Sequence, residues 1–110
     1  MNYQHQNLAE DGWAKLTVVE QLANVGSEVE RTISWKKKNN LEYSRLALER
    51  ALELLGFSIS LPQNRKRLKE LTRLRELLID YFLCQNQYQS SDVLWQKYFY
   101  AFAYAARVNH

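Results

Sequence analysis

The sequence predicts an all-α protein, an antiparallel up-and-down four-helix bundle. Three glycines and one proline in 110 residues are too few for a turn-rich β fold, so long helices are expected. Apolar residues recur at three- and four-residue spacings in four segments, which is the pattern of helices that each bury one face. A chain of this length is the size of one domain. We therefore expect residues 1–10 to form a flexible arm and residues 11–110 to form a single helical-bundle domain.

The first helix is predicted over residues 11–38, with Asp11 as its N-cap. Gly26 lies inside the apolar pattern, where glycine costs about 1 kcal/mol relative to alanine. Close approach of another helix or a local kink would explain a glycine at this position. The apolar stripe of this helix consists of Trp13, Leu16, Val19, Ala23, Gly26 and Ile33.

The second helix is predicted over residues 41–55, with Asn40 as its N-cap. Gly56 fits the position just after a helix end, where a left-handed backbone is wanted. Ser60 and Pro62 have the spacing of a helix start with proline in the first turn, so a third helix is expected from there to about Cys84.

The fourth helix is predicted from residue 92 towards residue 107, with Ser90 or Ser91 as its N-cap. At 1.5 Å per residue the first and third helices would be about 40 and 35 Å long, against about 25 Å for the second and fourth. The bundle is therefore expected to have two long and two shorter helices. Unusually, the apolar residues of the fourth helix cover most of its circumference: Val93, Leu94, Trp95, Tyr98, Phe99, Tyr100, Phe102, Tyr104 and Val108.

This aromatic helix has two interpretations. In the first, Trp95, Phe99 and Phe102 fill the core and the tyrosines lie at its edge with their hydroxyls in water. In the second, the surplus rings form a protein interface, because Tyr and Trp are enriched in such surfaces. The second interpretation makes the chain a homo-oligomer, a dimer or larger, or a module for another protein partner. Its candidate interface residues are Trp95, Tyr98, Tyr100 and Tyr104.

Basic residues are concentrated in the middle of the chain, where residues 35–75 hold eleven basic and four acidic side chains. Lysines at a helix C-terminus complement its dipole, and arginines on an exposed face keep a protein soluble. The alternative interpretation is a nucleic-acid-binding face, because Arg65, Lys69 and Arg73 recur every four residues and could follow a phosphate backbone.

The sequence predicts no catalytic residue, cofactor or metal site, and hence no enzyme. The two histidines, His5 and His110, are terminal, and the single cysteine, Cys84, is expected to be a small buried apolar residue. Arg107 and His110 resemble the paired Arg and His of HEPN-type ribonucleases, but too few residues separate them for a catalytic role to be carried over.

No segment has the roughly 18 consecutive apolar residues of a membrane span. Together with the lone cysteine, this predicts a cytoplasmic protein with no membrane partner.

In length, helix pattern and basic third helix, the chain resembles small prokaryotic helical-bundle proteins of unknown function. Among these are the four-helix-bundle proteins encoded by intervening sequences of ribosomal RNA genes. The resemblance covers about residues 11–108 and implies an oligomer with a role near nucleic acid. We therefore expect a non-catalytic helical-bundle interaction module that self-associates through its aromatic C-terminal helix, with nucleic-acid binding through the basic third helix as the alternative.

Overall fold

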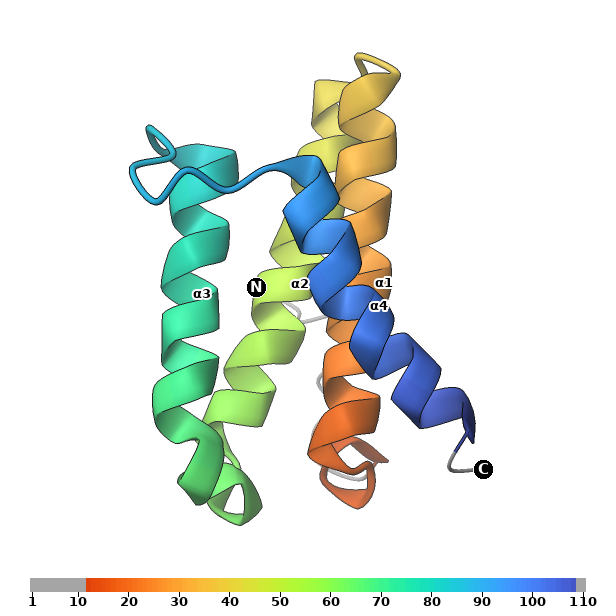
Figure 1. Ribbon diagram of the computed structural model, residues 1–110, viewed down its shortest axis with the longest axis vertical. Coiled ribbons are helices and arrows are strands. Elements are labelled where there is room, and N and C mark those ends of the chain that lie inside the picture. Colours follow the sequence, from red (N-terminus) through yellow and green to blue (C-terminus); the bar gives the residue numbers. More distant parts are fainter. Residues whose placement is uncertain (1–11, 109–110) are drawn as a thin grey trace.

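The chain forms an all-α bundle in the computed structural model, which describes residues 12–108. The predicted N-terminal arm lies outside these residues. Helix direction alternates along the chain, as predicted for an antiparallel up-and-down bundle (Figure 1). In chain order the elements are the 3-10 turn η2 (Trp13–Lys15), α1 (Val18–Lys37), α2 (Leu41–Ser60), the 3-10 turn η3 (Pro62–Arg67), α3 (Leu68–Leu83) and α4 (Asp92–Val108).

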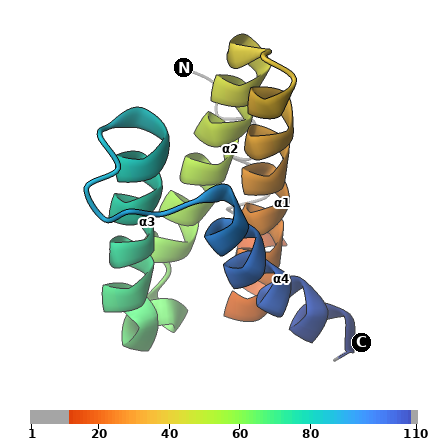
Figure 2. The ribbon, with the colours of Figure 1, turned by 45° about the horizontal axis from the view of Figure 1, so that its top comes forward.

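The four helices do not contact one another equally. α1 and α2 form a closely packed hairpin, α3 lies beside α2, and α4 crosses obliquely over α1. The turned view in Figure 2 shows the same neighbours, with α4 across α1 and α3 next to α2. The bundle is therefore built outward from the α1–α2 hairpin, and α3 and α4 flank a gap that their side chains fill only in part.

The first helix begins later than predicted. Thr17 is the N-cap of α1, and its hydroxyl and the Glu20 carboxylate each accept a hydrogen bond from the other residue's backbone N–H, at 3.1 and 2.9 Å. Asp11, the predicted cap, lies outside the described residues. The segment before α1 forms η2 instead, because it places the Trp13 ring in the core with 1% of its surface exposed.

The prediction that Gly56 ends the second helix is wrong. α2 continues to Ser60, and no described glycine has a positive φ. The extra turn is retained because Ser58 is fully buried and bonded to residues of other elements. Ser60 does not cap the next helix either: its hydroxyl donates back to the Phe57 carbonyl at 2.8 Å. The chain then turns through η3 before α3 begins at Leu68.

Other boundaries match their predictions. The Asn40 side chain caps α2 by accepting from the Tyr43 N–H at 3.0 Å, and the Ser91 hydroxyl accepts from the Leu94 N–H at 3.1 Å at the start of α4. The bundle has two longer helices, α1 and α2 with 20 residues each, and two shorter ones, α3 with 16 and α4 with 17. The second long helix is thus α2 rather than the third, because α2 includes the turn predicted to lie outside it.

The core runs between all four helices and is built from branched aliphatic side chains and three aromatic rings. Each core residue has at most 5% of its surface exposed, so water is excluded from the core. Its largest members are Trp13, Leu22, Val25, Val29, Ile33, Leu54, Leu55, Leu71, Leu74, Leu78, Trp95 and Phe99.

A buried polar network closes one end of the core. The Gln21 Oε1 accepts from the Ser58 hydroxyl at 2.7 Å and from the Asn64 Nδ2 at 2.9 Å. The Gln21 Nε2 donates to the Trp13 and Leu16 carbonyls, and the Trp13 Nε1 donates to the Ser58 Oγ. One side chain thereby joins η2, α1, α2 and η3. This network explains why the chain turns at η3, since Asn64 must point inward to reach Gln21.

Candidate interaction surface

Helix α4 is attached to the hairpin where it crosses α1 at Gly26. A Cβ on Gly26 would lie 2.7 Å from the Phe99 Cβ and 2.9 Å from its Cγ, closer than real Cβ contacts. The predicted close approach of another helix at Gly26 is therefore confirmed, and α4 is the helix that approaches. Phe99 stacks on Trp95 with ring centroids 5.9 Å apart, and both rings are buried.

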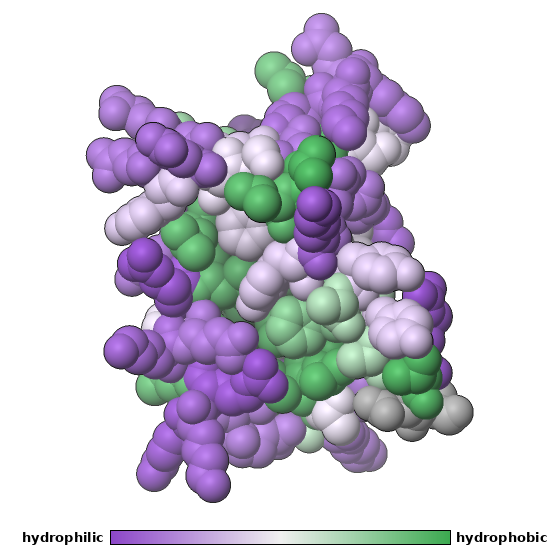
Figure 3. Space-filling view, viewed as in Figure 1, coloured by the Kyte–Doolittle hydropathy of each residue, from purple (hydrophilic) through white to green (hydrophobic). Residues whose placement is uncertain are grey.

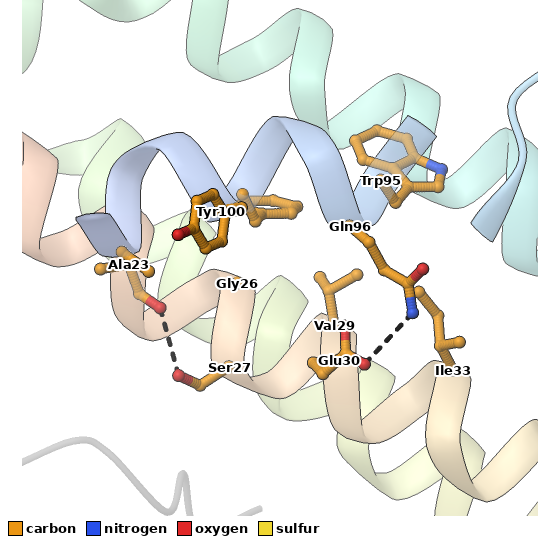
Figure 4. Close-up of a pocket in the computed structure, with 11 residues that line it drawn as sticks. Ala23, Gly26, Ser27, Val29, Glu30, Ile33, Trp95, Gln96 and Tyr100 are labelled. Carbon is orange, nitrogen blue, oxygen red and sulfur yellow. Dashed lines mark hydrogen bonds between the residues drawn. The ribbon is translucent and has the colours of Figure 1, made fainter. Parts of the chain in front are cut away.

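A hollow remains beside this crossing, between α1 and α4. Figure 4 shows Gly26 at its base, with Trp95 and Tyr100 on the α4 side. The Gln96 Nε2 donates to the Glu30 carboxylate at 3.2 Å across it. The hollow is open to solvent and holds no cluster of ionisable groups, so its geometry indicates imperfect packing of α4 rather than a site for chemistry.

The start of α4 is fixed by a charged cluster that joins three helices. The Asp92 carboxylate accepts from the Tyr81 hydroxyl at 2.6 Å and from the Lys36 Nζ at 2.9 Å. The Lys36 ammonium also lies 4.7 Å from the centroid of the Tyr81 ring, a cation–π contact. The cluster ties the C-terminal ends of α1 and α3 to the N-terminus of α4, where a negative charge also complements the helix dipole.

The ionisation of these groups follows from their contacts. Burial would raise the pKa of the Asp92 carboxyl, but the hydrogen bonds from Tyr81 and Lys36 outweigh it and hold that pKa below its ordinary value. Burial would lower the pKa of Lys36, and its bonds to Asp92 and Tyr81 raise it instead. Burial and the bond to Asp92 both raise the pKa of Tyr81. The cluster is therefore ionised as Lys36⁺ and Asp92⁻ near neutral pH.

We expect Asp92→Asn to lower the free energy of unfolding by about 1 kcal/mol or less at neutral pH, because solvent screens this half-buried pair. A carboxyl whose pKa is lowered on folding stabilises the fold above its unfolded pKa and loses that contribution as the pH falls through its folded pKa. The difference between wild type and variant should thus shrink as the pH falls below the ordinary carboxyl pKa of about 4, and it should vanish once the folded-state carboxyl is protonated. Urea unfolding at several pH values, followed by circular dichroism, measures it. A difference that stays constant with pH would contradict this assignment.

The solvent-facing side of α4 is largely apolar. Leu94, Tyr100, Tyr104 and Val108 have 56, 60, 53 and 59% of their surface exposed, and the rings of Tyr100 and Tyr104 stack with centroids 6.4 Å apart. Figure 3 shows the resulting band of green and near-white residues along the course of α4. We call this set of residues the outer face of α4: Val93, Leu94, Lys97, Tyr100, Ala101, Tyr104 and Val108. One helix therefore carries two apolar sides, only one of which is used by the bundle.

An apolar groove of about 340 Å³ separates α4 from α3 and adjoins the outer face. Leu74 and Leu77 from α3 and Leu94 and Tyr98 from α4 form its walls, and Arg73 and Glu70 stand at its rim. Burial, with the nearby Glu70 charge, raises the pKa of Tyr98 to about 12. The Tyr98 hydroxyl is therefore neutral at physiological pH, and it leaves the groove without a charge on the α4 side.

The four predicted interface residues fall into three environments. Trp95 is 5% exposed and belongs to the core, so its assignment to an interface is wrong; its Nε1 is buried and has no acceptor among residues 12–108. Tyr98 is half-buried in the groove, with its ring against Phe99 and Phe102. Tyr100 and Tyr104 are exposed. The structure thus brings the two outer tyrosines together and separates them from Trp95.

The predicted interface set did not include the aliphatic residues Leu94, Ala101 and Val108, although Leu94 and Val108 were counted among the apolar residues of the fourth helix. The signal was present, because residues 94, 97, 101, 104 and 108 repeat at alternating spacings of three and four. A second apolar repeat, at residues 95, 99, 102 and 106, overlaps with it in the sequence and faces the bundle interior. The overlap made the exposed repeat difficult to distinguish.

No protein-family model, curated protein or solved structure matches this chain. What the protein does must therefore be inferred from its own surface.

The basic residues singled out in the sequence are all exposed on η3 and α3. Arg65 belongs to η3, and Lys69 and Arg73 belong to α3. Arg73 stacks over the Tyr88 ring at 4.7 Å and lies 3.9 Å from the Glu76 carboxylate. The neighbouring Arg67 and Glu70 form an ion pair at 2.9 Å. Acidic side chains thus interrupt the positive surface on α3.

Cys84 is exposed at the end of α3, so the prediction of a buried cysteine is wrong: the helix ends there and the chain leaves the bundle. Among the described residues no three His, Cys, Asp or Glu side chains gather as a metal site would require. His5 and His110 lie outside the described residues. Within residues 12–108 no helix is both long and apolar enough to cross a membrane.

Proposed function

We propose that this chain is a cytoplasmic, non-catalytic interaction module that self-associates through the outer face of α4. The proposal depends on one observation: four large apolar side chains of this face, Leu94, Tyr100, Tyr104 and Val108, each have more than half of their surface exposed. Contiguous apolar surface of this kind on a small protein is typical of an interaction site. Large aromatic rings are also the side chains that contribute most to binding energy in protein interfaces.

The polar surroundings of the outer face support this proposal. Among the named residues of the outer face only Lys97 is charged, and the exposed Arg107 lies beside Tyr104 and Val108 in sequence. The adjoining groove between α3 and α4 continues the apolar surface. The rim of that groove carries both signs of charge, Arg73 and Glu70, as interface rims commonly do. An exposed thiol such as Cys84 persists in a reducing compartment, which agrees with a cytoplasmic location.

We expect the wild-type chain to scatter light as a dimer or larger species at micromolar concentration, and Leu94→Glu to shift it to monomer. A glutamate in the contact would be buried without a partner, and a loss of 1.4 kcal/mol already weakens association about tenfold. Light scattering after size-exclusion chromatography measures the mass. Since Leu94 is exposed, the circular dichroism of the variant should stay helical.

Leu41→Glu is the matched control. Leu41 is 65% exposed at the first position of α2, and a negative charge there suits the helix dipole. This variant should keep the wild-type mass. A wild-type chain that is monomeric at every concentration tested would overturn the proposal, and so would an equal loss of association in both variants.

Nucleic-acid binding remains the alternative, and its basis is the exposed basic surface of η3 and α3 with Arg65, Lys69 and Arg73. The ion pairs of Arg67 with Glu70 and of Arg73 with Glu76 reduce its net positive potential. Binding through phosphates falls steeply with added salt, whereas apolar self-association does not. Retained RNA or DNA that is released by salt, and lost when these three residues are replaced by glutamate, would favour the alternative.

A further inference from the structure

The spacing of five exposed residues of the outer face along α4 is nearly symmetric about Ala101. Leu94 and Val108, two aliphatic residues, lie seven positions before and after Ala101, and Lys97 and Tyr104 lie four before and three after it. All five are exposed. We call this set, Leu94, Lys97, Ala101, Tyr104 and Val108, the α4 seam. A pattern that is symmetric about its centre is complementary to a second copy of itself in the reverse direction.

We infer that two copies of this chain pair through their α4 seams in antiparallel orientation, about a two-fold axis that passes next to Ala101. The inference rests on the proposed self-association and adds the partner surface, the orientation and the register. In this arrangement the Leu94 side chain of one copy packs on Val108 of the other, and the Ala101 methyl groups meet at the axis.

Charge decides the orientation. In a parallel pair about a two-fold axis, Lys97 would face Lys97 of the second copy, and two ammonium ions would be brought together at the centre of an apolar contact. In the antiparallel pair, eight residues at 1.5 Å separate the two lysines by about 12 Å along the helix. Each lysine then lies beside the Tyr104 ring of the other copy, where a cation–π contact is favourable. Antiparallel helix dipoles add to this preference.

Packing decides the register. Two helices can approach to about 8 Å between axes only where the side chains at the crossing are small, and Ala101 is the smallest residue of the seam. The large residues, Tyr104 and Leu94, lie on either side of it, so the helices close around the alanine. The opposite side of α4 is occupied by Trp95 and Phe99 in the core, which leaves the seam free to contact a second copy without any rearrangement of the bundle.

Single cysteines test the axis directly. In a Cys84→Ser background, which removes the native exposed thiol, Ala101→Cys should form a disulfide-linked dimer under mild oxidation, because two Cα atoms beside the axis lie within the 4.4–6.8 Å range of disulfides. Leu94→Cys and Val108→Cys should each stay unlinked alone, since each lies seven residues, or about 10 Å, from the axis and therefore about 20 Å along the helix from its own symmetry copy. An equal mixture of these two variants should yield a linked heterodimer. Non-reducing gels measure all four samples.

Each outcome has one meaning. Linkage of Leu94→Cys and Val108→Cys alone, together with Ala101→Cys, would show a parallel pair and overturn the inference. A wild-type chain that is a dimer by light scattering, with no linkage at Ala101→Cys, would overturn the register while leaving the proposed function in place. A wild-type chain that is monomeric would overturn both the antiparallel pairing and the proposed function. Circular dichroism of each cysteine variant confirms that the exposed substitutions leave the helices intact.

Discussion

Replacing Gln21 with leucine is expected to lower the free energy of unfolding by about 3 kcal/mol, a large part of the 5–15 kcal/mol that stabilises a typical domain. The side chain is fully buried and its two polar atoms make four hydrogen bonds. Leucine fills a similar volume but offers no acceptor to Ser58 and Asn64, and no donor to the carbonyl of Leu16. A buried polar group left without a partner costs about 1–3 kcal/mol.

Urea unfolding followed by circular dichroism measures this loss, at one protein concentration because self-association would add to the stability. Asn24→Leu is the matched control, since it also replaces an amide side chain with leucine, at an exposed position on the same helix. It should alter stability by about 0.5 kcal/mol or less. Equal effects in the two variants would contradict the role assigned to the buried network.

Phe99→Ala is expected to cost about 3–5 kcal/mol, the usual range for truncating a phenylalanine in a packed core. Phe99 is 5% exposed and lies directly over Gly26, so its ring packs α4 against α1 at the helix crossing. The same chemical denaturation assay measures the cost. Leu83→Ala is the control, because Leu83 is an apolar residue of α3 with 58% of its surface exposed and should tolerate truncation. A loss below about 1 kcal/mol for Phe99→Ala would mean that other contacts hold α4 in place.

The crossing can also be tested from the α1 side. Gly26→Ala introduces a Cβ that would overlap the root of the Phe99 side chain rather than its flexible end, so α4 must shift as a whole. Overpacking of this kind costs about 1–3 kcal/mol, and the better helix propensity of alanine returns up to about 1 kcal/mol. A net loss of about 1–2 kcal/mol is expected. A variant with a higher free energy of unfolding than wild type would show that α4 can move away from Gly26 without destabilising the fold.

The four-helix architecture follows from local rules that the sequence states directly. Asn40 and Ser91 cap α2 and α4 through contacts within three residues, and the apolar spacing of each segment defines which side is buried. Gly26 also gave a correct signal, because a glycine inside a strong helical pattern needs a packing reason. These features depend on neighbours in the chain, and local sequence is sufficient to predict them.

The boundaries and the candidate site were decided by contacts between distant residues. Gly56 and Ser60 have the right identities for a helix end and a helix start, yet α2 continues past Gly56 and ends only at Ser60, because Ser58 is held by Trp13, 45 residues away. Distant contacts also decided which side of α4 is buried. Both sides of α4 are apolar in sequence, and packing against α1 buries Trp95 and Phe99. Leu94 and Tyr104 are left exposed. The sequence by itself therefore determined the number, type and direction of the helices. The tertiary structure decided where they end and which aromatic residues face solvent, since helix propensity and capping are local whereas burial depends on the whole fold.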